Sequence, residues 1–488
     1  MKYSFNLSIF SLIICGCYFI WGGFSSGQNW GDDFAAYIMQ GQGIANGNIK
    51  DFLTSNKYTV ENSSYQMGPT AYPWGFPIFI AITYFYVGFN LYAFKMIGLC
   101  SYAGFLFSLF FGFKSKLSKF SLFFILSFFA FNPFIYGTAD QILSDLPFLF
   151  FSTISIFYIQ HIYVDHKKVI NIYSLFFLGV LINLSFLIRT NGLILIPILF
   201  IAQFFSYKNL NLTTNKLLII SKNLIPYFVF IILYFSIQFL LPNGGSSHLG
   251  HLKDINFETI KTNLFFYLYA PHDFFRNIYI YLVFSIVFFV GLFNQKKDDY
   301  ILSAYISLTF LAYLIWPNSQ DIRFLLPILP FYMYFSLKGL AFIQYKISFF
   351  YLKRIFLLLS CSICLILITS NFLMMFKYSL SNRESGRPIP EGPFTPLSEE
   401  LFSYIKNNTE ATDVIIFWKP RVMHLLTQRN AIMILDINKI PNESILVLDL
   451  KNLSSQISLS ELNKLIVNNK ASLIFENSQF QAFKISAP

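Results

Sequence analysis

The chain has 488 residues, of which 55% are hydrophobic and only 12% are charged. Soluble proteins carry about 25% charged residues, so this chain lacks the polar surface that a soluble core of such apolar content needs. The composition excludes a soluble enzyme, a disordered chain and a disulfide scaffold, and it predicts an α-helical polytopic membrane protein. The net charge of +11 is then assigned to Lys and Arg in cytoplasmic loops, and no nucleic-acid partner is expected.

Apolar runs long enough to cross a membrane, which takes about 20 helical residues, recur from the N-terminus onward. The first, Phe5–Phe24, follows a short basic start and has no small-residue cleavage site, so we expect an uncleaved anchor. Further runs bring the prediction to about 11 spans, at 91–113, 119–137, 145–163, 170–187, 190–206, 224–242, 277–293, 300–316, 324–342 and 354–375.

One apolar stretch, Tyr72–Gly88, is left out of this count. If it crossed the membrane, the basic loop 114–119 would lie outside, against the positive-inside rule. We therefore expect an interfacial or re-entrant helix there. The N-terminus is then cytoplasmic, the C-terminus is extracytoplasmic, and two large outer loops cover 25–90 and 243–276. This topology predicts an integral protein of the plasma (inner) membrane.

The composition changes after the last span. Residues 1–376 form the predicted transmembrane module, and 377–396 form a linker rich in Pro, Gly and Arg. Residues 397–488 then alternate one helical pattern, LSEELFSYIKNN, with short apolar runs typical of buried strands (DVIIFW, AIMIL, ILVLDL and SLIFE). We expect a small α/β domain outside the membrane.

Ionisable residues near apolar runs are costly and therefore point to function. The predicted topology gathers several at the outer ends of spans: Asp32, Asp33, Asp140, Asp145, Arg189, Asp321 and Arg323. Each also has a plainer interpretation, because an Asp at a helix start is often an N-cap and an Arg at a span end often reaches for the headgroups.

Five motifs around these residues are GDDFAAY (31–37), YPWGFP (72–77), LSDLPFLFF (143–151), LIRTNGL (187–193) and SQDIRFLLPILP (319–330). In order, spacing and side of the membrane they resemble motifs of the GT-C membrane glycosyltransferases, which include protein mannosyltransferases and lipid A aminoarabinose transferases. The resemblance covers roughly residues 1–345. It departs from the family where Gly68 stands before Pro69, where Phe34 follows the acidic pair, and where Thr190 replaces a proline.

The resemblance implies sugar transfer, with inversion, from a polyprenyl-phosphate donor to an acceptor protein, lipid or envelope glycan on the extracytoplasmic side. Asp33 is implied as the general base, with Asp32 as the alternative. Among the substrate-binding residues implied, Arg323 and then Arg189 would stabilise the leaving phosphate, Asp145 would position the donor, and Tyr72 and Tyr37 would complete the set.

The sequence does not identify a cofactor. A divalent metal ion is one option, with Asp145 and Glu61 as candidate ligands, and no nucleotide cofactor is expected. His248, His251 and His272 lie in one outer loop, but no carboxylate pattern accompanies them. The expected partners are the lipid-linked donor, membrane lipids and the acceptor.

Three alternatives stay open. A transporter or flippase for lipid-linked glycans predicts polar groups at mid-membrane depth and broken spans. A non-catalytic assembly protein would place Asp33, Asp145 and Arg323 far apart. A polymerase or ligase of outer glycans is chemically adjacent to the transferase.

Overall fold

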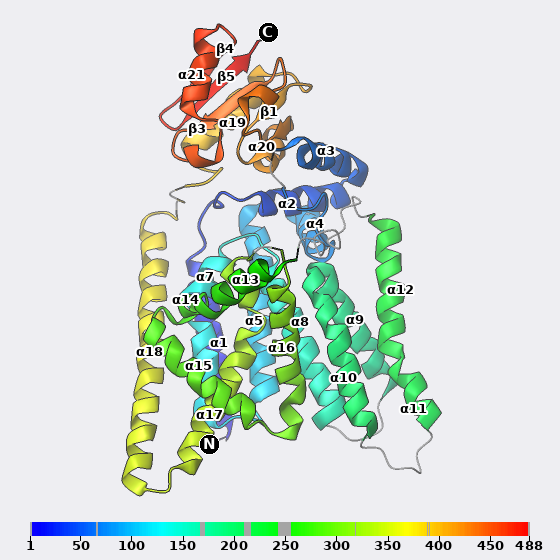
Figure 1. Ribbon diagram of the computed structural model, residues 1–488, viewed down its shortest axis with the longest axis vertical. Helices are drawn as coiled ribbons and strands as arrows, with labels where there is room; N and C mark the ends of the chain where they lie inside the picture. The colour runs from blue at the N-terminus through cyan, green and yellow to red at the C-terminus, as the bar shows by residue number, and fades with distance from the viewer. Residues whose placement is uncertain are drawn as a thin grey trace.

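In the computed structural model, a long helical body carries a small sheet at one end (Figure 1). The structure describes residues 2–64, 67–165, 171–208, 216–242, 255–317, 319–387, 389 and 391–486. The N-terminus lies at the end of the helical body away from the sheet, and the C-terminus lies on the sheet, so the two termini are at opposite ends (Figure 1).

A helix occupies each predicted span. These are α1 (Lys2–Gly22), α5 (Leu91–Phe113), α6 (Lys119–Ala130), α8 (Asp145–Gln160), α9 (Ile172–Ile188), α10 (Leu195–Lys208), α12 (Ile225–Leu240), α15 (Ile278–Phe293), α16 (Tyr300–Leu314), α17 (Leu329–Lys346) and α18 (Phe350–Glu384). Within the described residues, six helical segments are long and apolar enough to cross a membrane, or up to eight if each of two bent pairs is one span. The chain is thus an integral membrane protein, and the count of about 11 stays a prediction.

The first of the two bent pairs has a cause in the sequence. α6 ends at Ala130, and Pro133 then opens α7 (Pro133–Ala139) at an angle of 45°, because proline fits the first turn of a helix but not its interior. The segment containing α13 (Phe257–Tyr269) and α14 (His272–Phe275) meets α15 at 113°. The short α11 (Lys216–Asn223) precedes α12.

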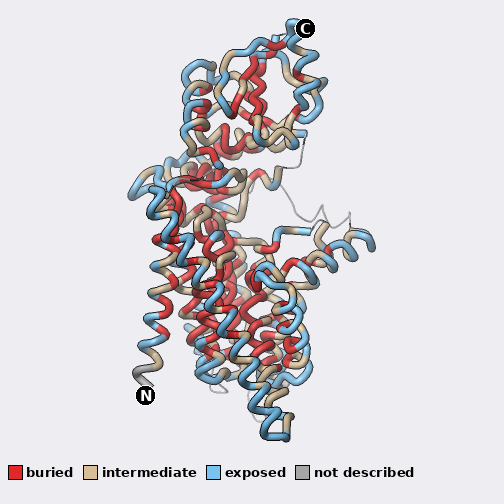
Figure 2. Tube along the Cα trace, turned by 90° about the vertical axis from the view of Figure 1, so that its left-hand side faces the viewer, coloured by how far each residue is buried: buried red, intermediate tan, exposed pale blue. Residues whose placement is uncertain are grey.

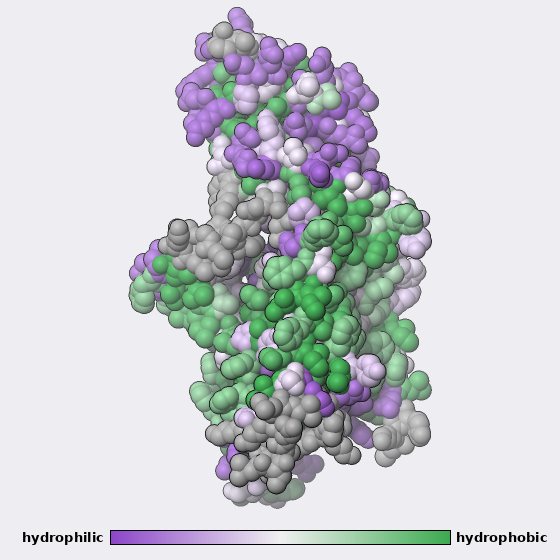
Figure 3. All heavy atoms as spheres, turned by 90° about the vertical axis from the view of Figure 1, so that its right-hand side faces the viewer, coloured by the Kyte–Doolittle hydropathy of each residue, from purple (hydrophilic) through white to green (hydrophobic). Residues whose placement is uncertain are grey.

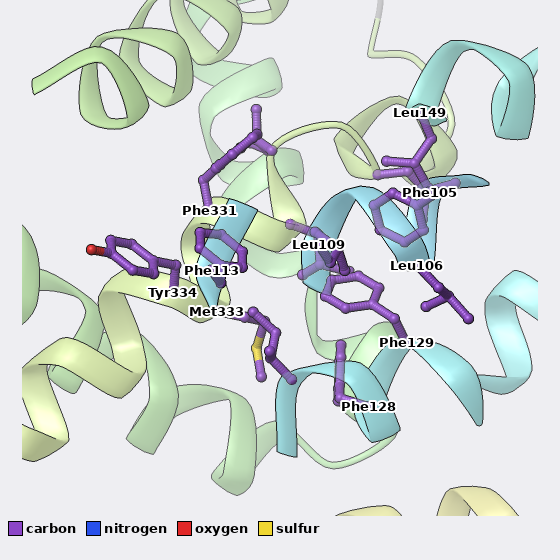
Figure 4. Packing of buried hydrophobic residues seen from close by; sticks show 14 of the residues in the cluster. Phe105, Leu106, Leu109, Phe113, Phe128, Phe129, Leu149, Phe331, Met333 and Tyr334 are labelled. Atoms are coloured by element: carbon purple, nitrogen blue, oxygen red, sulfur yellow. The ribbon is translucent and has the colours of Figure 1, made fainter. Parts of the chain in front are cut away.

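The surface and the interior of the body are both apolar. Hydrophobic residues cover much of the helical body, whereas the sheet region is largely hydrophilic (Figure 3). Phe239 and Phe293 are 89% and 81% exposed, which suits lipid rather than water. Buried residues run along the middle of the body (Figure 2). There Phe113 of α5 stacks on Tyr334 of α17, with ring centroids 4.8 Å apart (Figure 4).

Three helices of the first large loop cross the top of the body (Figure 1). They are α2 (Asp32–Ala45), α3 (Ile49–Asn62) and α4 (Gly75–Val87). α4 is apolar but has only 13 residues, about 20 Å of helix, which is too short to span a bilayer. The stretch left out of the span count is therefore a short helix, as expected.

The C-terminal segment folds as a five-stranded sheet of order β2-β1-β3-β5-β4. Its strands are β1 (Val414–Ile416), β2 (Asn430–Ile432), β3 (Ile445–Asp449), β4 (Ala471–Glu476) and β5 (Phe480–Ile485), and its helices are α19 (Pro396–Asn408), α20 (Pro420–Thr427) and α21 (Leu459–Val467). β1 pairs in parallel with β2 and β3, and β5 is antiparallel to β3 and β4.

Two details of this segment differ from the sequence prediction. β5 was not expected, and it pairs with β3 at the centre of the sheet. SLIFE was expected to be a buried strand, but β4 lies at the sheet edge, where Ser472, Leu473 and Glu476 are exposed. In addition, α18 continues to Glu384 and so runs through the first part of the predicted linker.

Candidate active site

Asp33 lies in the first turn of α2, where a carboxylate is stabilised by the helix N-terminus. Its side chain is 37% exposed. The Tyr72 hydroxyl donates to Asp33 Oδ1 at 2.6 Å, and Arg323 Nη2 donates to Asp33 Oδ2 at 3.4 Å. These two donors fix the position of the carboxylate, which stays accessible to a substrate.

Asp145 begins α8, and its carboxylate is 2% exposed. Ser144 is the N-cap residue, but it makes no side-chain capping bond. Instead Arg189 Nη1 donates to Asp145 Oδ1, and Arg323 Nη1 lies 3.7 Å from Asp145 Oδ2. The Asp145 carboxylate therefore pairs with two arginines.

Arg189 follows the last residue of α9, at a turn that depends on two glycines. A Cβ on Gly192 would lie 2.5 Å from the backbone of Ser185, and a Cβ on Gly75 would lie 2.7 Å from the backbone of Leu187. Glycine at both positions lets the turn after α9 and the start of α4 pack closely. The Arg189 guanidinium, held there, lies 4.3 Å from the centroid of the Phe324 ring.

Arg323 lies in a short 3-10 helix (Ile322–Leu325), with its side chain 24% exposed. It connects the two carboxylates, Asp33 and Asp145. Its Nε–H is buried and has no hydrogen-bond acceptor in the described part of the chain, since Asp321 Oδ2 lies 3.9 Å away. A buried donor without a partner is costly, so this N–H is available for an acceptor atom that the described residues do not supply.

Tyr72 and Tyr37 differ in position. Tyr72 contacts Asp33 directly, whereas Tyr37 is 5% exposed and packs behind it, with the two tyrosine ring centroids 4.7 Å apart. The Tyr37 hydroxyl pairs with Ser144 Oγ at 3.0 Å. Burial and the nearby Asp33 raise the pKa of Tyr72 well above its usual value, so this hydroxyl stays protonated and acts as a donor.

Asp32 does not join this group. It lines a separate cavity of about 410 Å³ together with Met67, Trp418, Lys419, Met433, Leu435, Ser454 and Ser455. Its Oδ1 is buried and finds no partner among the described residues. Burial raises the pKa of Asp32 to about 6, although the charges of Arg421 and Lys419 oppose this shift. The adjacent carboxylates therefore face different surroundings.

We expect Asp32→Asn to stabilise the protein above pH 6. The unfolded carboxyl has a pKa near 3.9, so the folded state loses stability as pH rises from about 4 to 6. Asn removes this loss, which predicts a gain of about 1–3 kcal/mol above pH 6 and no gain near pH 4. Melting temperatures of both proteins in detergent from pH 4 to 8 would check this, and a difference independent of pH would contradict it.

Asp140 also lies outside the group, in a buried ion pair. Lys95 of α5 is fully buried, and its Nζ donates to Asp140 Oδ1 at 2.7 Å, Ser25 O at 3.0 Å and Gly27 O at 2.6 Å. Asp140 in turn accepts from the Ser25 backbone N–H at 2.8 Å. This pair anchors the start of the first outer loop, just ahead of α2.

We expect Lys95→Met to destabilise the protein by about 3–5 kcal/mol, because it strands a carboxylate and two carbonyl oxygens without their cation. The matched control is Lys57→Met, since Lys57 forms only an exposed pair with Glu61 at 3.7 Å, worth at most about 1 kcal/mol. Thermal unfolding in detergent compares the two, and equal melting temperatures would refute the anchoring role.

The candidate metal ligands do not come together. Glu61 is exposed on α3 and pairs with Lys57, whereas Asp145 has an arginine beside each oxygen. Among the described residues, no group of three or more His, Cys, Asp and Glu side chains could hold a metal ion. His248 and His251 lie outside the described residues, and His272 Nε2 lies 3.2 Å from Asp273 Oδ1.

One residue of this region was not expected from the sequence. Arg421, at the start of α20, is 1% exposed and reaches Tyr72. The pattern KPRV around it (419–422) carries no signal of a site; only the packing of α20 against α2 brings it there.

Comparison with solved structures supports the overall fold. The chain is similar to ArnT from Cupriavidus metallidurans bound to undecaprenyl phosphate, with 8% identity, a TM-score of 0.61 and 100% of both chains covered. It is also similar to an Archaeoglobus fulgidus oligosaccharyltransferase tethered with an acceptor peptide, with 10% identity, a TM-score of 0.58, and 98% of this chain and 74% of the other covered.

A third similar structure is the Archaeoglobus fulgidus oligosaccharyltransferase AglB in complex with an inhibitory peptide and a dolichol-phosphate, with 11% identity and a TM-score of 0.52, covering 91% of this chain and 70% of the other. No family model and no curated protein matches the chain. The chain therefore has the GT-C fold of membrane glycosyltransferases, as the five motifs predicted.

Proposed function

We propose that this protein transfers a sugar from a polyprenyl-phosphate carrier to a hydroxyl of an acceptor on the extracytoplasmic side of the plasma membrane. The observation that carries the proposal is Arg323, whose guanidinium contacts Asp33 and Asp145 while its Nε–H has no acceptor in the described chain. A base and an anion-binding cation thus lie side by side, on a fold shared with structures that hold undecaprenyl phosphate and dolichol-phosphate.

In this mechanism Asp33 accepts the proton of the acceptor hydroxyl. The acceptor oxygen attacks the anomeric carbon from the face opposite the carrier. The bond between that carbon and the phosphate oxygen breaks, and its electron pair leaves with the polyprenyl phosphate, so the configuration inverts. Arg323 offers its planar cation to the negative charge that develops on the phosphate.

The surrounding residues suit these roles. Tyr72 holds Asp33 Oδ1 at 2.6 Å, whereas Arg323 Nη2 reaches Oδ2 only at the longer distance of 3.4 Å, so Oδ2 is the oxygen proposed to take the incoming proton. The charge of Asp145 holds both Arg189 and Arg323 at the site of the leaving group. Among the described residues no group of three or more His, Cys, Asp and Glu side chains could hold a metal ion, and the steps of this proposal use protein side chains alone.

The membrane position follows from the same proposal. The carrier is a membrane lipid, so its tail lies among the spans and its sugar phosphate reaches the helices of the first outer loop. The basic residues of the loops at the other end support a cytoplasmic N-terminus in this proposal. The C-terminal sheet then lies outside, on the side of the acceptor.

The test uses the full chain in detergent with radiolabelled polyprenyl-phosphate sugars, supplied one at a time with cell-envelope extract as the acceptor source. We expect label to leave the carrier and enter a new product, with release of polyprenyl phosphate. Folded protein that consumes no donor would overturn the proposal. The product identifies the acceptor as protein, lipid or glycan.

A further inference from the structure

Arg421 makes an unusual set of contacts for a residue of the C-terminal segment, because they all reach into the first outer loop. Nε donates to Asn56 Oδ1 at 3.0 Å, and Nη2 donates to the Pro69 carbonyl at 2.8 Å. Nη1 donates to the Tyr72 hydroxyl oxygen at 3.4 Å. The guanidinium is 1% exposed, and no carboxylate lies within 4 Å of it among the described residues.

Such a cation is costly to bury, and it is not needed to attach the C-terminal segment. Other bonds already make that attachment. Thr59 Oγ1 donates to the Ala431 carbonyl at 2.9 Å, the Ser64 N–H donates to the Met433 carbonyl at 2.7 Å, and the Met433 N–H donates to Ser63 Oγ at 3.0 Å. The charge of Arg421 acts on Asp32, but the three hydrogen bonds of its guanidinium go to other groups and call for an explanation of their own.

The Tyr72 hydroxyl supplies that explanation. A hydroxyl has one proton and can both donate and accept. Because Arg421 can only donate, its bond uses a lone pair of the Tyr72 oxygen and leaves the proton of Tyr72 for Asp33 Oδ1, 2.6 Å away. The three residues form a directed chain, Arg421 to Tyr72 to Asp33, and hydrogen bonds in such chains polarise one another.

We propose that Arg421 is a positioning residue for the transfer reaction, which fixes the Tyr72 hydroxyl as a donor to Asp33 and so makes the C-terminal segment a part of the active site. This inference rests on the proposed function for its kinetic consequence. The effect of Arg421 on the environment of Asp33 can be measured without any sugar transfer.

The variants are chosen to separate positioning from folding. Arg421→Met removes the chain of donors, and Arg421→Lys keeps the charge but loses the three-way fork. Tyr72→Phe removes the intermediate hydroxyl. The control is Arg429→Met, because Arg429 also bonds neighbouring groups, Thr409, Thr427 and the Lys406 carbonyl, but only within the C-terminal segment.

The first readout is kinetic. We expect Arg421→Met and Tyr72→Phe each to lower kcat about tenfold with little change in the donor KM, and the double variant to lose about tenfold rather than a hundredfold, since both act through one bond. Arg421→Lys should not restore the rate, and Arg429→Met should keep it. A hundredfold loss in the double variant, or an equal loss in Arg429→Met, would overturn the inference.

The second readout needs no transfer activity. Carboxylates are labelled with a water-soluble carbodiimide and glycine ethyl ester at a fixed pH, and fragment-ion mass spectrometry quantifies the label on Asp33 separately from that on the adjacent Asp32. Loss of a hydrogen-bond donor to Asp33 should raise the labelling of Asp33 about fivefold in Arg421→Met and Tyr72→Phe. In Arg429→Met the labelling should equal that of the wild type. If Arg421→Met were labelled to the same extent as the wild type, the inference would be refuted, whether or not the protein consumes a donor. If the labelling changed as expected but the wild-type protein transferred no sugar, only the proposed function would be refuted.

Discussion

Asp33→Asn is expected to lower kcat for sugar transfer by about 10³-fold, near the middle of the range for a lost general base, with the donor KM within about twofold. The amide has the same size as the carboxylate and still accepts from Tyr72, but it cannot take the proton of the acceptor hydroxyl. Initial rates with radiolabelled donor, measured on protein of unchanged melting temperature, check this expectation.

A matched control for this experiment is Asp273→Asn. Asp273 is 57% exposed on α14, and its side chain pairs with His272 rather than with the site. The Asp273→Asn variant should transfer sugar at the wild-type rate. If Asp33→Asn also retained that rate, Asp33 would not be the base, and Asp32 would have to be tested in the same way.

Arg323→Gln is expected to lower kcat about 10²-fold, because the planar cation that would stabilise the leaving phosphate is lost. The same change should weaken product inhibition by the polyprenyl phosphate that the proposed reaction releases. Arg323→Lys keeps a charge but not the bidentate geometry, so its kcat should lie between that of the wild type and that of Arg323→Gln. Asp145 retains its bond to Arg189 in both variants, which limits structural damage.

Arg276→Gln controls for the loss of one positive charge, since Arg276 is exposed at the end of α14. Its rates and product inhibition should match those of the wild type. Unchanged product inhibition in Arg323→Gln would show that another group holds the phosphate, and Arg189 would be the next candidate.

Local patterns in the sequence determined much of this architecture. Every predicted span contains a helix, and α4 stays short, as the charge of the loop at 114–119 required. Because the sides of a membrane alternate along a chain of spans, the sequence also predicted that Asp33, Asp145 and Arg323 lie at one end. The structure brings them into contact, against the assembly-protein alternative, which placed them far apart.

The spacing of the motifs could not predict which residues surround each carboxylate. Asp32 and Asp33 are adjacent, but successive residues on a helix point about 100° apart, so one faces the C-terminal sheet and the other faces Arg323. Asp140 and Asp145 are also close in sequence, but they have different partners. Helix packing pairs Asp140 with Lys95 and Asp145 with two arginines.

By itself, then, the sequence determined the membrane class, the helices and the end of the molecule at which the charged groups gather, because hydropathy, length and loop charge are local quantities. The tertiary structure alone decided which charges pair, where Asp32 points, and that Arg421 reaches Tyr72 from a distant part of the chain. Such contacts depend on how α20 packs against α2, and no local pattern encodes the partner of a long-range contact.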